Sequence, residues 1–124
     1  MFEVSVCTRT GKVLRRFDLT DPLSAGRCVR IGRAEDCDIC IRADGVSRYH
    51  CEIAPEDVDA CVVRDLGSTY GTYVNGRRVE ELEIEPGLAV QVGPAVLRFH
   101  PVTPRVSREL QEQLREELGA GDDS

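Results

Sequence analysis

The sequence contains few of the residues on which catalysis commonly depends. Among its 124 residues there is no tryptophan, and the only histidines are His50 and His100. It lacks the G-x-S-x-G and H-E-x-x-H motifs and a glycine-rich phosphate loop ending in Lys-Ser or Lys-Thr. Ser47 lies close to His50, but the sequence pattern supplies neither an orienting carboxylate nor an oxyanion hole. We therefore expect a protein that is not an enzyme and that uses no cofactor.

The chain also lacks a long apolar segment. No run approaches the ~20 residues that a membrane-spanning helix needs. The first residues, 1–4, show no basic stretch followed by an apolar segment, so a secretory signal is not expected. The hydrophobic share of 41% is ordinary for a single globular domain. We expect a cytoplasmic protein without membrane contact.

Cysteine occurs six times, which is below the share found in secreted disulfide scaffolds. Cys51 and Cys61 lie in apolar segments, where a free cysteine behaves as a small hydrophobic residue. Cys37 and Cys40 have C-x-x-C spacing, but a structural zinc site needs two further ligands and a redox motif needs a strand-to-helix context. We expect reduced thiols and no metal site, with a metal or redox role as the less favoured alternative.

Lysine occurs only once, at Lys12, so arginine supplies nearly all of the 16 basic residues. The net charge of −6 argues against nonspecific binding to nucleic acid. Arginines nevertheless gather in the middle of the chain, at Arg27, Arg30, Arg33, Arg42, Arg48 and Arg64. Because physiological salt screens charges beyond about 8 Å, a local basic pocket can still capture an anion.

Short apolar segments alternate with turn residues along most of the chain. The pattern predicts strands over residues 2–7, 13–19, 28–31, 39–41, 49–53, 60–65, 73–74, 77–79, 82–84, 89–92 and 95–99. Asn75-Gly76 predicts a two-residue hairpin turn, because both positions tolerate a positive φ. Residues 21–26 are predicted as a loop and 55–57 as an acidic turn. Together these segments predict an all-β sandwich.

Residues 102–124 have a different character, and we expect them to follow a domain over 1–101. An apolar residue recurs every four positions and predicts a short amphipathic helix: Val106, Leu110, Leu114 and Leu118. Ser107 is suited to begin this helix and Gly119 to end it, with a disordered terminus beyond. At about three turns the helix is marginal, which favours one that packs on the sandwich or frays over one that docks or dimerises.

Three segments carry the most informative motifs. They are Gly32-Arg33, Ser47-Arg48-Tyr49-His50, and the run D-L-G-S-T-Y-G-T-Y-V-N-G over residues 65–76. In this order and spacing, each in a loop between predicted strands, they resemble the forkhead-associated (FHA) domain family across roughly residues 4–100. The resemblance implies an eleven-stranded β-sandwich whose loops at one end bind phosphothreonine peptides. It implies a phosphothreonine-containing partner in signalling by a Ser/Thr kinase, either the kinase or one of its substrates.

The resemblance also implies a set of residues that bind the phosphopeptide: Arg33, Ser47, Arg48, Thr69 and Tyr70. Phosphothreonine carries a charge of about −1.5 to −2 and three acceptor oxygens, so it requires cationic, hydroxyl and main-chain donors. Many family members have asparagine where this chain has Tyr70. A phenol cannot donate and accept like a planar amide, so Tyr70 would pack against the peptide or donate one hydrogen bond, and peptide selection stays open.

Four further residues are expected to support these loops: Gly32, His50, Asn75 and Gly76. A histidine here can hydrogen-bond neighbouring main chain, and Asn75 can accept the unusual φ of its turn. Alternatives remain, since Arg33 could pair with an acidic neighbour and Ser47 could cap a turn. For the whole protein, the alternative is a scaffold of the same fold that binds a partner without phosphate, through its sheet faces or its tail.

Overall fold

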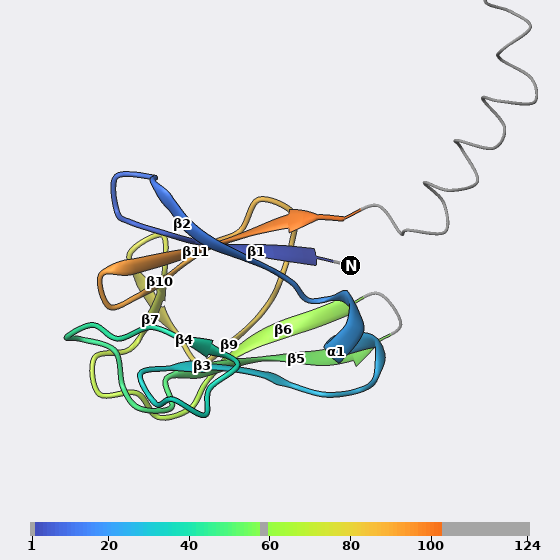
Figure 1. Cartoon of the computed structure of the whole chain (residues 1–124), viewed down its shortest axis with the longest axis horizontal. Helices are drawn as coiled ribbons and strands as arrows, with labels where there is room; N and C mark the ends of the chain where they lie inside the picture. Colours follow the sequence, from blue (N-terminus) through green and yellow to red (C-terminus); the bar gives the residue numbers. More distant parts are fainter. Residues whose placement is uncertain (1, 58–59, 103–124) are drawn as a thin grey trace, which may run out of the picture.

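The computed structural model describes residues 2–57 and 60–102. Two packed β-sheets form a sandwich (Figure 1). The first sheet has the order β2 (Val13–Asp18), β1 (Phe2–Cys7), β11 (Ala95–Pro101), β10 (Ala89–Val92), β7 (Thr72–Val74) and β8 (Arg77–Val79). The second has the order β4 (Ile39–Cys40), β3 (Val29–Gly32), β5 (Cys51–Asp57), β6 (Ala60–Asp65) and β9 (Glu81–Glu83). Within the residues described, the expected β-sandwich with eleven strands is therefore confirmed.

The core lies between the two sheets and follows from the alternation of side chains along the strands. In β11, Ala95, Leu97 and Phe99 are buried, whereas the residues between them are more exposed. Ile31 of β3 and Ile53 of β5 are also fully buried, and they belong to the same hydrophobic cluster. Burying each such side chain contributes about 1.5–3 kcal/mol, which fixes the strands from which the loops extend.

Most predicted strands are confirmed within two residues of their bounds. The prediction of a turn over residues 55–57 is wrong, because β5 continues through Pro55 to Asp57 opposite β6. The register shifts between Pro55 and Asp57, and such a bulge accommodates the missing N–H of proline. Sequence periodicity does not reveal this continuation, since proline and two acids interrupt the apolar pattern.

The prediction of a loop over residues 21–26 is also wrong in part, because Thr20–Ser24 form the short helix α1. Pro22 is compatible with a first helical turn, where its missing N–H is not needed. Leu23 is buried against the core and anchors the helix. It is the single helix among the described residues, so the expected C-terminal helix over 106–118 has no support here and lies outside them.

The predicted β7–β8 hairpin is confirmed. Asn75 and Gly76 have φ values of 53° and 77°, and the flanking strands pair in register. Within residues 2–57 and 60–102, no helix is long and apolar enough to cross a bilayer.

Candidate functional site

The loops that carry the predicted site residues gather at one end of the sandwich. The loops β3–β4, β4–β5 and β6–β7 lie together there, on the left of the view in Figure 1. Two of them connect strands of the second sheet, and the third crosses from β6 in the second sheet to β7 in the first. The sandwich thus brings together residues that are separated by up to several tens of positions in the sequence.

Main-chain hydrogen bonds fix the β3–β4 loop against the β4–β5 loop. The Arg33 N–H donates to the Ser47 carbonyl oxygen at 2.9 Å, and the Ala34 N–H donates to the Arg48 carbonyl oxygen at 3.1 Å. Gly32 makes this approach possible, because a Cβ atom there would overlap the Arg48 carbonyl oxygen. Gly32 is therefore needed because the main chain of Arg48 approaches it closely, and not because its φ is unusual.

The Arg33 side chain is exposed, and one hydrogen bond from its Nε atom fixes it to the neighbouring loop. Its Nε–H donates to the Val46 carbonyl oxygen at 3.1 Å. The expected alternative partners of Arg33 are engaged elsewhere, since Glu35 pairs with Arg42 at 3.3 Å and Asp36 accepts the Tyr49 hydroxyl at 3.0 Å. Among the described residues the Arg33 guanidinium has no ion pair, so its terminal nitrogens remain available to an anion.

Ser47 and Thr69 meet across the two loops. The Thr69 N–H donates to the Ser47 Oγ at 2.9 Å, although 22 positions separate the two residues. The Ser47 hydroxyl accepts in this bond, so its own proton can still be donated outward. Thr69 is exposed, and its hydroxyl has no hydrogen-bond partner in the part of the chain that the structure describes. Its main-chain N–H, however, is already used by Ser47.

The imidazole of His50 connects the β4–β5 loop, at Ser47, with the β6–β7 loop, at Gly71. It is fully buried, its Nδ1 accepts the Ser47 N–H at 3.0 Å, and its Nε2 lies 2.9 Å from the Gly71 carbonyl oxygen. Burial lowers the pKa of His50, against opposing effects of the Gly71 carbonyl and the Asp65 carboxylate. The neutral form with hydrogen on Nε2 satisfies both partners, so His50 holds Ser47 of the second sheet's loops to the start of β7 in the first.

Asp65, at the end of β6, is a supporting residue that the sequence prediction missed. Its carboxylate accepts the Ser68 hydroxyl at 2.6 Å, the Thr72 hydroxyl at 2.7 Å, and the main-chain N–H groups of Gly67 and Ser68 at 2.9 and 3.1 Å. Burial raises the pKa of Asp65, but these hydrogen bonds outweigh it and leave the pKa lowered. The D-x-G-S pattern was the available signal, because Asp commonly accepts from main chain two or three residues ahead.

The remaining predicted residues are placed in two ways. Arg48 and Tyr70 are exposed at this end of the molecule, with Tyr70 at 65% exposure. Asn75 and Gly76 lie in the exposed β7–β8 turn and share no hydrogen bond with Ser47 or Thr69 in the described structure. Their supporting role therefore stays a prediction.

Arg33 also borders a pocket of about 540 Å³ together with Arg42, Glu35 and Asp44. Two arginines and two carboxylates of the β3–β4 and β4–β5 loops thus surround an open space. Arg42 is paired with Glu35, so among the described residues that line this space Arg33 is the cation left for an anion, and the main chain at Arg33 is already fixed by its hydrogen bond to Ser47.

The cysteines form no candidate metal centre. Within the described residues, no group of three or more His, Cys, Asp or Glu side chains is arranged to hold a metal ion. All six cysteines are free thiols, and burial raises the pKa of Cys51 to about 12. The thiols of Cys37 and Cys40 point toward the carbonyl oxygens of Arg48 and Arg33, at 3.3 and 3.5 Å. They therefore pack beneath the loops.

Comparison with known proteins agrees with this arrangement. Residues 29–93, more than half of the chain, match the family model of the FHA domain. The chain belongs to the FHA domain family. FHA domains are modules for protein interaction rather than enzymes.

Two relatives illustrate the likeness. The chain is 36% identical over 118 residues to the ABC transporter ATP-binding/permease protein Rv1747 of Mycobacterium tuberculosis, covering 95% of this chain and 13% of that protein. It is 34% identical over 74 residues to the FHA domain-containing protein FhaB of Mycolicibacterium smegmatis, covering 59% of this chain and 47% of that protein. The chain thus spans less than half the length of these curated relatives.

Solved structures share the fold. The crystal structure of the FhaA FHA domain complexed with the intracellular domain of Rv3910 has a TM-score of 0.66 and 27% identity, covering 81% of this chain and 100% of that chain. Its full length is covered, so the FHA sandwich is the common structural unit.

Proposed function

We propose that this FHA domain binds phosphothreonine in a partner protein and mediates phosphorylation-dependent protein association in Ser/Thr kinase signalling. The observation that carries the proposal is the contact of Ser47 with Thr69 beside the unpaired Arg33 guanidinium. The Ser47 hydroxyl, the Thr69 hydroxyl and the Arg33 guanidinium belong to loops that are hydrogen-bonded to one another, which supports their acting on one ligand. This combination suits a phosphate ester with three acceptor oxygens.

The expected strength of this interaction is moderate. Hydrogen bonds to a charged group are worth about 1.5–3 kcal/mol each, and association costs reduce their sum. With Arg33, Ser47 and Thr69 contributing, binding of about 8 kcal/mol corresponds to micromolar affinity, as reversible signalling requires. His50 and Asp65 hold the loops beforehand, so little ordering accompanies binding.

The related FhaA domain supports a protein partner, since its crystal structure contains the intracellular domain of another protein. By analogy we propose a phosphorylated protein as the ligand here, either a Ser/Thr kinase or one of its substrates. The domain then acts by binding alone, without catalysis, cofactor or nucleic acid. Its hydroxyl and arginine donors match a phosphate on an extended peptide segment.

The test is a titration calorimetry experiment with matched peptides. A phosphothreonine peptide selected from a library, its unphosphorylated copy and its phosphoserine copy are titrated into the wild type. We expect Arg33→Ala to weaken binding of the phosphothreonine peptide by at least tenfold, whereas Arg16→Ala, an exposed arginine on the edge strand β2, leaves it unchanged. Equal affinity for the phosphorylated and unphosphorylated copies would refute the proposal.

That last result would favour the alternative, a scaffold that binds without phosphate. One observation supports it: Val13 and Leu14 of β2 are 42% and 56% exposed at the edge of the first sheet. An unpaired edge with apolar side chains can receive another strand. Loss of binding in Leu14→Lys, with no effect of Arg33→Ala, would identify this mode.

A further inference from the structure

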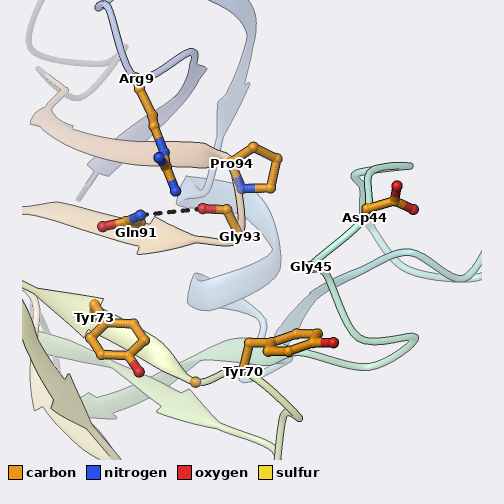
Figure 2. Close-up of a pocket in the computed structure, with 9 residues that line it drawn as sticks. Arg9, Asp44, Gly45, Tyr70, Tyr73, Gln91, Gly93 and Pro94 are labelled. Carbon is orange, nitrogen blue, oxygen red and sulfur yellow. Dashed lines mark hydrogen bonds between the residues drawn. The ribbon is translucent and has the colours of Figure 1, made fainter.

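A second pocket lies next to the proposed phosphothreonine site in the β6–β7 loop. None of the proposed phosphate contacts Arg33, Ser47 and Thr69 lines it. It has a volume of about 310 Å³ (Figure 2). Its lining includes Arg9, Asp44, Tyr70, Tyr73, Gln91 and Pro94. Tyr70 follows Thr69 in the chain, so the pocket begins within about 4 Å along the main chain of a proposed phosphate contact. A peptide whose phosphate binds at Thr69 can therefore place a neighbouring side chain in this pocket.

The lining of this pocket is mainly apolar, with two tyrosine rings and a proline that come from separate elements. Tyr70 belongs to the β6–β7 loop and Tyr73 to β7, and Figure 2 shows both rings on one side of the pocket. Pro94 comes from the β10–β11 turn. Tyr70 is 65% exposed, so its ring is accessible to a bound peptide. These surfaces suit the aliphatic stem of a side chain.

The far side of the pocket is polar and carries one unpaired cation. Arg9, from the β1–β2 loop, extends from the side opposite the tyrosine rings toward Gln91 and Gly93 (Figure 2). Among the described residues Arg9 has no ion pair. The Gln91 amide donates to the Gly93 carbonyl oxygen at 3.4 Å, which orients it along this wall. A guanidinium that faces a partly apolar pocket favours a carboxylate.

We infer that this pocket selects an acidic side chain, glutamate in particular, close in sequence to the phosphothreonine of the bound peptide. The inference rests on the proposed function. The two methylenes of glutamate pack against the tyrosine rings, and its carboxylate reaches Arg9 on the opposite side. Aspartate is one methylene shorter and reaches less far, and leucine fills the aromatic part while leaving Arg9 without a partner.

Asp44 limits this selection and supplies a second, opposite test. It lies at another edge of the pocket on the β4–β5 loop, and it also borders the pocket of Arg33 and Arg42 (Figure 2). Its carboxylate repels an acidic ligand, so removing its charge strengthens the preference for glutamate. Arg9 and Asp44 are thus expected to act with opposite sign on the same peptide.

The test uses one phosphothreonine peptide in which each position from four before to four after the phosphothreonine carries glutamate, glutamine or leucine. At one position we expect glutamate to bind about three- to fivefold more tightly than glutamine, as an exposed arginine–carboxylate pair provides. Arg9→Gln should remove this difference without changing the affinity for the glutamine peptide. Asp44→Asn should widen it, because this change removes the charge that opposes an acidic ligand.

Two results would overturn the inference. One is a glutamate preference at no position of the scan, and the other is a preference that Arg9→Gln leaves intact. Failure of the proposed function is recognised separately, because phosphorylated and unphosphorylated glutamine peptides are compared in wild-type protein. If those two bind equally, both the proposed function and this inference fall. If only the phosphorylated one binds and glutamate gives no advantage, the inference alone is wrong.

Discussion

Replacing Gly32 by alanine tests the idea that close main-chain contact builds the site. Among the described glycines, Gly32 alone has an ordinary φ, so alanine meets no conformational penalty there. A Cβ atom would nevertheless lie 2.8 Å from the Arg48 carbonyl carbon and overlap its oxygen, while the Cys37 sulfur stands at 3.1 Å. The obstacle is main chain, which cannot turn away as a flexible side chain would.

The magnitude follows from what must move. Crowding of this kind costs about 1–3 kcal/mol. Displacing the Arg48 carbonyl also strains the hydrogen bonds from Ala34 to Arg48 and from Arg33 to Ser47, which are worth about 0.5–1.5 kcal/mol each. Alanine also restricts the unfolded chain more than glycine does, which offsets about 0.4–1 kcal/mol of this loss. We expect Gly32→Ala to lower the free energy of unfolding by about 2–4 kcal/mol.

Urea unfolding measures this loss, and Gly87→Ala is the matched control. Gly87 has a φ of +85° with open space around the missing Cβ, so alanine there costs about 1 kcal/mol from backbone strain alone. Gly32→Ala should cost more than this control and should also weaken phosphopeptide binding, which Gly87→Ala should not. A Gly32→Ala protein as stable as wild type would refute the reasoning.

Three further predictions concern titratable groups. The pKa of His50 is lowered below its usual 6.5, so below that pH the unfolded chain binds a proton that the folded chain does not. Stability should therefore fall as pH drops below about 6.5. Urea unfolding at several pH values should show a shallower fall in His50→Gln than in the wild type. The pKa of Asp65 is lowered below 3.8, so its stabilisation is present above that pH and lost as pH falls further; Asp65→Asn should cost about 1–3 kcal/mol at pH 7 and remove this acid dependence in the same assay. In native protein a thiol reagent should label the exposed Cys28 promptly but reach the buried Cys51, with its pKa of about 12, only after unfolding, and rapid labelling of Cys51 would contradict its burial.

Local patterns predicted most strands, because short apolar or alternating segments stand between turn residues. Phe2–Cys7 alternates between apolar and polar residues in the sequence, whereas Ala60–Asp65 carries a continuous apolar run whose residues 61–63 are buried. Local patterns failed where a distant partner decides the structure. Pro55 remains within β5 because β6 lies opposite it, and Thr20–Ser24 form a helix because Leu23 finds space in the core.

The site shows the same division. Motif spacing predicted that Arg33, Ser47 and Thr69 lie in loops, and the folded chain joins the last two by a hydrogen bond. The central position of Asp65 was missed because its four hydrogen bonds depend on how the following loop folds back. The Arg9 pocket could not be predicted, since its lining is assembled from four separate stretches of chain.

The position of His50 has a consequence for how this protein could be monitored. Its ring hydrogen-bonds Ser47, in a loop of the second sheet, and Gly71, which directly precedes β7 of the first sheet. The proposed binding site therefore exists only while both sheets are packed together. A ligand that binds only the folded protein stabilises it and so raises the melting temperature. At a ligand concentration one hundred times the dissociation constant, the added free energy of unfolding is about 2.7 kcal/mol. Simple thermal melting thus becomes a screen for unknown partners.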